Sequence, residues 1–185
     1  MRHVVSLMVG ALLLGGCARA PAMPPLTDRT QEAGQGSQSG AGAPLSFRVT
    51  RYPGGEPYDF ASERGNVVLL DVWATWCEPC RDALPTYEAL AREYGPKGLK
   101  VYALNVDEDP RAIAPFLQET KVTLPILQDA NAQVAERTLK VRVMPTSFLI
   151  DRRGVVRHVR EGFAEDFLQL YQTEIEELLA EPAKR

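Results

Sequence analysis

The chain has 185 residues, of which 45% are apolar and 24% charged, and its formal net charge is −3. This composition suits one globular domain with a sizeable core, and it excludes a chain that is disordered throughout. The mild negative charge also excludes a nucleic-acid partner, because a duplex binder needs a basic face.

The first 16 residues have the pattern of an export signal. Arg2 gives a positive start, and an almost unbroken apolar stretch follows over residues 4–14. This stretch is too short to cross a hydrocarbon core, which takes about 20 residues. Its length fits the apolar region of a signal peptide. We therefore predict a signal peptide over residues 1–16.

The end of this stretch, Leu14-Gly15-Gly16-Cys17, resembles the bacterial lipobox, where a lipoprotein signal peptidase cuts before a cysteine that is then acylated. The resemblance implies that a lipid on Cys17 anchors the protein to a bacterial membrane. An ordinary secretory signal cut after Ala22 is the alternative. Either signal predicts a domain outside the cytoplasm, facing the periplasm. In some bacteria an aspartate directly after the lipidated cysteine retains lipoproteins at the inner membrane, and this chain has Ala18 there. The choice between the inner and the outer membrane therefore stays open.

Residues 17–44 are predicted to form the lipidated cysteine and a flexible tether. Residues 18–44 are rich in Ala, Pro, Gly, Ser and Gln, with almost no large apolar side chains. Such a segment cannot bury enough surface to offset the entropy lost on ordering. A tether of this length has an r.m.s. reach of roughly 30 Å. The folded domain is then predicted over residues 45–185.

The first half of this domain is predicted to begin with strands. Alternating apolar residues predict an edge strand over 45–52, and Pro53-Gly54-Gly55 marks a turn. A continuous apolar run predicts a strand over 66–73 that is buried on both faces. A helix with one apolar stripe follows over 79–94 and ends at Gly95-Pro96.

The second half continues the alternation of strands and helices. Residues 99–106 predict a second buried strand, and Asp109-Pro110 starts a helix that Pro115 must kink or restart. A short strand over 124–127 and a short helix over 131–138 follow.

A hairpin and a final helix complete the predicted domain. Its strands, over 147–150 and 155–160, flank a turn that contains Gly154. An apolar stripe then marks the C-terminal helix (Leu168, Tyr171, Ile175 and Leu178). The order of elements predicts an α/β fold with a mixed central sheet and helices on both faces.

Two of the three cysteines, Cys77 and Cys80, form a C-x-x-C motif where the buried strand gives way to a helix. A helix N-terminus carries partial positive charge and free N–H groups, which stabilise a thiolate. We predict that Cys77, at the helix start, attacks a substrate disulfide. Cys80, one turn in and more buried, then resolves the mixed disulfide. A paired-ligand zinc site lacks its second half, so we expect neither a metal nor a cofactor.

The residues between and before the cysteines are expected to tune the site and contact the substrate. The carboxylate of Glu78 disfavours a thiolate on Cys77, which favours the disulfide form and predicts a reductase over an oxidase. Pro79 is tolerated in the first helical turn. Trp76 is expected to form part of a flat apolar docking surface, whereas Trp73 is expected in the core.

Residues 68–80, VLLDVWATWCEPC, resemble the active-site stretch of the TlpA/ResA-like branch of the thioredoxin superfamily. Residues 143–151, VMPTSFLID, resemble the second signature of that family. The resemblance covers about residues 45 to 180 and implies a thioredoxin-like fold and thiol-disulfide exchange. It also implies a cis bond between Met144 and Pro145, packed against the cysteine pair. The backbone before Pro145, at Met144, would pair with an extended substrate segment.

Asp71 lies in the buried strand, where a carboxylate is costly unless it is paired or protonated. Thioredoxins have an aspartate in the matching place, so the resemblance implies that Asp71 shuttles a proton to the buried cysteine. Close TlpA/ResA-like relatives usually have asparagine there, with a glutamate three residues past the second cysteine, where this chain has Ala83. A structural carboxylate with satisfied partners is the alternative for Asp71.

The resemblance also implies the partners. Substrates would be disulfide-containing exported proteins: apocytochrome c in cytochrome c maturation, copper-site cysteines of oxidase subunits, or damaged proteins. The electron donor would be a membrane carrier of the CcdA/DsbD kind, and we expect a monomer. Three other readings remain: a Sco-type copper chaperone using His158, a thiol peroxidase, or a non-enzymatic lipoprotein. The first needs a wider cysteine spacing, and the second lacks a cysteine three residues after its reactive one.

Overall fold

The computed structural model describes residues 42–164 and 166–182. The predicted signal peptide, Cys17 and nearly all of the predicted tether lie outside the described residues. Near the start of the described part, the backbone N–H of Leu45 donates to the carbonyl of Gly154 at 2.7 Å. No helix in the described ranges has the length and apolar character needed to cross a membrane.

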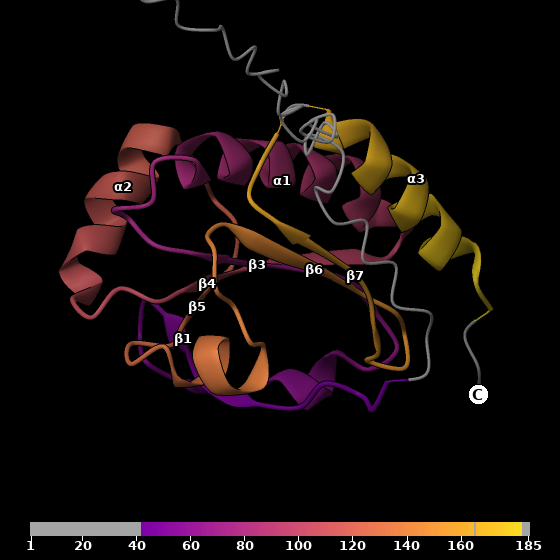
Figure 1. Cartoon of the computed structure of the whole chain (residues 1–185), viewed down its shortest axis with the longest axis horizontal. Helices are drawn as coiled ribbons and strands as arrows, with labels where there is room; N and C mark the ends of the chain where they lie inside the picture. Colours follow the sequence, from indigo (N-terminus) through magenta and orange to yellow (C-terminus); the bar gives the residue numbers. More distant parts are fainter. Residues whose placement is uncertain (1–41, 165, 183–185) are drawn as a thin grey trace, which may run out of the picture. The chain divides into compact units, whose positions relative to one another are not determined.

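A seven-stranded sheet, in the order β2-β1-β5-β4-β3-β6-β7, forms the centre of the described part of the chain (Figure 1). The central strands β3, β4 and β5 run parallel to one another, and every other pairing is antiparallel. The predicted mixed sheet is therefore confirmed. The strands are β1 (Arg48–Tyr52), β2 (Pro57–Asp59), β3 (Val67–Trp73), β4 (Leu99–Asn105), β5 (Ile126–Gln128), β6 (Thr146–Ile150) and β7 (Val156–Glu161).

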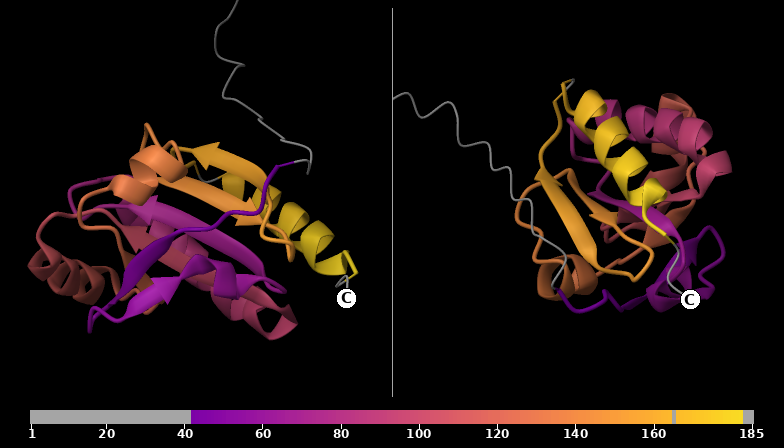
Figure 2. Two further views of the ribbon diagram at one scale, coloured as in Figure 1. Left: turned by 90° about the horizontal axis from the view of Figure 1, so that it is seen from below. Right: turned by 90° about the vertical axis from the view of Figure 1, so that its right-hand side faces the viewer.

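Helical segments cover both faces of this sheet, as predicted, but unequally. Leu69 and Trp73 of β3 point into a core formed with residues of three α-helices, and α1 and α3 lie side by side on this face (Figures 1 and 2). Leu70 and Val72 point to the other face, which is covered by the two short helical segments that contain Phe60 and Ala135. The α-helices are α1 (Cys80–Tyr94), α2 (Ile113–Thr120) and α3 (Phe167–Ala180), and the short segments are η2 (Phe60–Glu63), η3 (Gly95–Lys97), η4 (Pro110–Ala112) and η5 (Val134–Thr138).

The predicted edge strand over 45–52 is not at the edge of the sheet. Strand β1 lies between β5 and β2, and the short strand β2 forms the edge. Sequence reasoning missed β2 because it has only three residues and starts with Pro57, which an edge strand tolerates since no ladder bond is lost there.

Two predicted helices also start later than expected. The Asp109 side chain caps only the 3₁₀ turn η4, and α2 begins at Ile113. This places Pro115 in the first turn of α2, where its missing N–H costs nothing. The helix predicted over 131–138 is confined to η5, because Ala132 has a φ of 51° and the Asp129 carboxylate accepts from Val134 and Ala135 N–H groups.

The C-terminus of α3 is fixed to the β6–β7 turn by Arg152. Its guanidinium donates to the carbonyls of Leu178, Leu179 and Glu181 at 2.9, 3.1 and 2.7 Å. A cation at this end satisfies free carbonyls and complements the helix dipole. The contact holds α3 over the sheet, so that its buried Tyr171 faces β6.

Candidate active site

Cys77 and Cys80 form a disulfide at the junction between β3 and α1. Cys77 is 5% exposed and Cys80 is 0% exposed, which confirms the prediction that Cys80 is the more buried cysteine. Helix α1 starts at Cys80, so Cys77 lies in the turn before the helix and not in its first turn. The reason is that the chain enters the helix through a tight turn, in which Cys80 N–H donates to the Cys77 carbonyl at 3.1 Å.

Asp107 holds the loop that carries the first cysteine. This carboxylate, only 5% exposed, accepts from the backbone N–H and the hydroxyl of Thr75, both at 2.9 Å. It also accepts from the Asn105 amide at 2.6 Å. Sequence reasoning missed this brace. Asp107 follows β4 and Thr75 follows β3, and the carboxyl ends of neighbouring parallel strands meet at one edge of a sheet.

We expect Asp107→Ala to weaken both stability and exchange. The substitution leaves three partly buried donors without their acceptor, so the free energy of unfolding should fall by about 1–3 kcal/mol. Exchange at Cys77 should slow, because the Thr75–Trp76 loop loses its anchor. Urea unfolding and disulfide-exchange rates test this, with the exposed neighbour Glu108→Ala as the control. Equal effects of the two substitutions would contradict the bracing role.

The peptide bond between Met144 and Pro145 is cis, as the family resemblance implied. Pro145 is buried immediately before β6, and its carbonyl accepts from the N–H of Gly162 at 2.7 Å. Half-buried Met144 packs against the core cluster that contains both cysteines. A second cis bond, between Tyr52 and Pro53, was not predicted.

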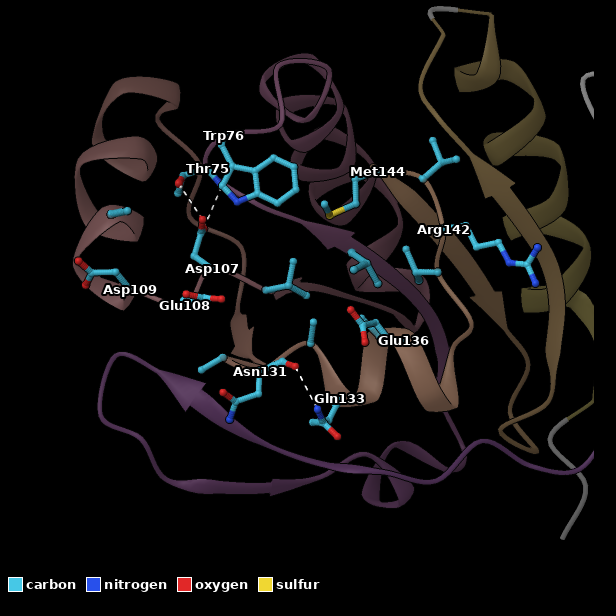
Figure 3. Close-up of a pocket in the computed structure, with 18 residues that line it drawn as sticks. Thr75, Trp76, Asp107, Glu108, Asp109, Asn131, Gln133, Glu136, Arg142 and Met144 are labelled. Carbon is cyan, nitrogen blue, oxygen red and sulfur yellow. Dashed lines mark hydrogen bonds between the residues drawn. The ribbon is translucent and has the colours of Figure 1, made fainter.

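A groove of about 960 Å³ runs beside this site (Figure 3). Trp76 and Met144 lie near one end of it, and Trp76 is 70% exposed. The floor is apolar and includes Val72 and Val106, while the rim carries charged side chains (Glu108, Asp109, Glu136 and Arg142). An extended polypeptide could therefore lie beside the disulfide with apolar side chains on the floor.

Comparison with known proteins places the chain in a family. Residues 41–159 match the model of the AhpC/TSA family. The chain belongs to the AhpC/TSA family. Over 98 residues it is 33% identical to the thiol-disulfide oxidoreductase ResA of Oceanobacillus iheyensis, a match that covers 53% of this chain and 50% of that protein. With ResA of Bacillus thuringiensis subsp. konkukian it shares 30% identity, covering 65% and 70% of the two chains.

Solved structures agree with this AhpC/TSA assignment. A crystal structure from Chlorobium tepidum, described as a thiol:disulfide interchange protein DsbE, has a TM-score of 0.70 and 32% identity. The match covers 76% of this chain and 97% of that one. The fold is thus thioredoxin-like, and with its bridged C-x-x-C pair the chain is a thiol-disulfide oxidoreductase of the ResA/DsbE type.

Glu78 has less influence on this AhpC/TSA-family site than its sequence position suggests. Its side chain is 89% exposed and lies 3.6 Å from the guanidinium of Arg81, which also pairs with Glu119 at 2.8 Å. Water and the neighbouring cation both screen a carboxylate in this position. The structure therefore does not support the argument from Glu78 by which the sequence predicted a reductase.

Asp71 is fully buried, and neither of its carboxylate oxygens has a hydrogen-bond partner among the described residues. Burial raises the pKa of this carboxyl well above its usual range. The alternative of a satisfied structural carboxylate does not fit these surroundings. Its side chain shares the α1-facing side of β3 with Leu69 and Trp73, the side on which both cysteines lie. The place of the relatives' glutamate is filled by buried Ala83.

Sequence reasoning also missed polar contacts on this face. Tyr171 was predicted only as a member of an apolar stripe, but its hydroxyl is hydrogen-bonded to the hydroxyl of Tyr87 on α1. A tyrosine at a buried helical position needs a partner for its hydroxyl, and this was the available signal. His158, the histidine of the copper-chaperone reading, lies on β7 with its Nδ1 3.1 Å from Glu174. In residues 42–164 and 166–182, no cluster of three or more His, Cys, Asp or Glu is placed to hold a metal.

Proposed function

We propose that this protein is an extracytoplasmic disulfide reductase that acts on exported proteins. The observation that carries the proposal is the Cys77–Cys80 bridge, in which Cys77 is the less buried residue. The Cys77 thiolate attacks a substrate disulfide, and one substrate sulfur leaves as a thiol after taking a proton. Cys80 then loses its proton and attacks Cys77, which releases the second substrate thiol. Two electrons have passed to the substrate, and the bridge has formed again.

The direction of the reaction is supported by the burial of Cys80. Full burial of Cys80 disfavours a thiolate at this position. Oxidising members of this fold depend on a strongly stabilised thiolate, which gives a reduction potential of about −120 mV. We expect equilibration with glutathione to give a value closer to that of thioredoxin, about −270 mV. A potential near −120 mV would contradict the reductase assignment.

The activity itself is tested with insulin. The reduced protein should reduce insulin disulfides in the presence of dithiothreitol, and a Cys77→Ser, Cys80→Ser double variant should not exceed the rate of dithiothreitol alone. Activity in the double variant would place the chemistry elsewhere. A lack of activity in the unmodified protein would favour the non-enzymatic reading.

Trp76 is proposed to form the docking surface for protein substrates. Trp76→Ala should lower kcat/KM for insulin about tenfold, because exposed aromatic anchors at interfaces contribute on the order of 1–2 kcal/mol. The rate with a small disulfide such as 5,5′-dithiobis(2-nitrobenzoate) should change little. Leu170→Ala, which truncates another exposed apolar side chain on α3, is the control. Equal losses for both substrate classes would contradict a docking role.

The chain organisation remains our proposal: signal peptide 1–16, lipidated Cys17 with its tether to residue 44, and a thioredoxin-like domain over 45–185. Its support is the lipobox-like sequence before Cys17. The full chain should appear in the membrane fraction with a diacylglyceryl group on Cys17. Cys17→Ser should lose both properties. A lipid-free mature protein starting after Ala22 would instead show an ordinary secretory signal.

The partners are proposed on the family resemblance. The groove beside Trp76 and Met144 suits an extended segment, as a substrate protein would offer. Apocytochrome c is the first candidate substrate, and a membrane carrier of the CcdA/DsbD kind the candidate electron donor. Glu78, Pro79 and Met144 would contact the substrate, and Asp71 would move a proton to or from Cys80.

A further inference from the structure

Three buried hydroxyl groups lie on the same face of the sheet as Asp71 and the cysteines. The hydroxyls of Ser147 and Tyr171 are 2.5 Å apart, and those of Tyr171 and Tyr87 are 3.1 Å apart. They come from β6, α3 and α1, and each side chain is 2% exposed or less. The two tyrosine rings meet edge to face, with centroids 5.5 Å apart. The reductase cycle described above does not use this cluster.

Asp71 lies next to one end of the cluster. In the antiparallel pairing of β3 with β6, Asp71 is directly opposite Ser147. Side chains of opposed residues project from the same face with their Cβ atoms about 5 Å apart. Neither carboxylate oxygen of Asp71 has a partner among the described residues, and the Ser147 hydroxyl belongs to the residue directly opposite it on β6.

The charged groups near the cluster lie on β7 and α3. The guanidinium of Arg160 lies 4.9 Å from the centre of the Tyr171 ring and is paired with Glu174. His158 also contacts Glu174. Helix α1 contributes Tyr87 and Cys80, and the residue of β4 opposite Asp71 is the apolar Ala103. Arg160 is directly opposite Ser147 on β7, so that Ser147 separates this cation from Asp71 on β3.

We propose that Ser147, Tyr171 and Tyr87 form a chain of hydroxyl donors that stabilises Asp71 as a carboxylate, the form that can take the proton of Cys80. Tyr87 donates to Tyr171, Tyr171 to Ser147, and Ser147 to Asp71. The inference rests on the proposed role of Asp71. The three residues are positioning residues, because they act on the reaction through Asp71.

The three hydroxyl groups assist the second step of exchange, in which Cys80 must lose a proton. The Cys80 thiol gives its proton to the Asp71 carboxylate, and the Cys80 thiolate attacks Cys77. The substrate thiolate that leaves then takes the proton from Asp71, so that protons balance. A buried carboxylate without a donor is strongly disfavoured, whereas hydrogen bonds to a charged acceptor are stronger than those between neutral groups.

The test measures the pH dependence of the second step alone. The reduced protein is mixed with 5,5′-dithiobis(2-nitrobenzoate); attack by Cys77 releases one thionitrobenzoate, and attack by Cys80 releases the second. Ser147→Ala and Tyr171→Phe should move the midpoint of the second phase about one pH unit higher. The second phase is then about tenfold slower at a fixed pH below the midpoint. The first phase should keep its rate, and Ser147→Thr should rescue the second.

The matched control is Tyr94→Phe. Tyr94 is also a buried α1 tyrosine bonded to α3, since its hydroxyl donates to Glu176 at 2.9 Å. Its loss therefore removes an α1–α3 contact away from Asp71, and the second-phase midpoint should stay in place. Identical profiles for Tyr171→Phe, Ser147→Ala and Tyr94→Phe would overturn the proposal. Near-ultraviolet circular dichroism confirms the fold of each variant. Tyr87→Phe removes the hydroxyl furthest from Asp71 and should cause a smaller shift of the second-phase midpoint.

The same experiment distinguishes this proposal from the two proposals on which it rests, the role of Asp71 and the reductase cycle. In an Asp71→Asn background, Tyr171→Phe should cause no additional shift, and a persisting shift would show that the hydroxyls act on Cys80 directly. An unchanged profile for Asp71→Asn alone would overturn the role of Asp71, and this inference with it. The absence of any second phase in the unmodified protein would overturn the reductase cycle itself.

Discussion

Replacing Cys80 with serine should convert the protein into a covalent trap for its substrates. Cys77 can still attack a substrate disulfide, but the resolving thiol next to it is gone. The mixed disulfide, a short-lived intermediate in the unmodified protein, should persist through purification. Non-reducing electrophoresis should show dithiothreitol-sensitive adducts, and mass spectrometry should identify the proteins that Cys77 holds.

Cys77→Ser is the matched control, because it keeps one thiol in the motif but leaves only the fully buried one. It should capture almost nothing. Equal capture by both variants would contradict the assignment of Cys77 as the attacking thiol. Adducts that contain apocytochrome c would support it as the substrate. Adducts restricted to other exported proteins would exclude apocytochrome c but keep the proposed substrate class.

Asp71→Asn should slow the second step of exchange and change how stability depends on pH. Burial raises the pKa of Asp71 in the folded state. The folded protein therefore keeps a proton that the unfolded chain loses near pH 4. The stabilisation is complete below the unfolded pKa and is lost as the pH rises towards the folded pKa, by about 1.4 kcal/mol per pH unit. Asparagine carries no such proton, so the variant should lack this decline.

Urea unfolding of the oxidised protein and the variant between pH 4 and 8 measures the effect. The difference between the two curves isolates Asp71, because other titrating groups contribute equally to both. Asp82→Asn, which removes an exposed carboxylate from the first turn of α1, should leave the slope unchanged. Parallel curves for the unmodified protein and Asp71→Asn would show that the buried carboxyl does not titrate in this range.

The sequence was sufficient to predict the central strands and the position of the cysteine pair. Every residue of β3 is buried, so that a continuous apolar run was a reliable signal. The cis bond before Pro145 followed from the resemblance of a short motif. In contrast, β2 has three residues and no pattern that separates it from a loop. Its place in the sheet depends on pairing with β1, which local sequence does not encode.

The supporting polar groups of the site were harder to predict for a related reason. Asp107 reaches Thr75 across 32 positions of sequence, and Tyr171 reaches Ser147 across 24. Each contact forms only because the sheet order brings distant elements together. A residue pattern can predict that a tyrosine lies on the buried side of a helix, but it does not predict which residue forms the hydrogen bond with its hydroxyl.

The order in which the two thiols react tests the account most directly. The reduced protein is treated with a limiting amount of iodoacetamide at neutral pH, and tandem mass spectrometry locates the modified cysteine. We predict that Cys77 is alkylated well before Cys80. Protein that has not been alkylated should form the Cys77–Cys80 bridge again on oxidation. Faster modification of Cys80, or two cysteines that never exchange between dithiol and bridge, would contradict it.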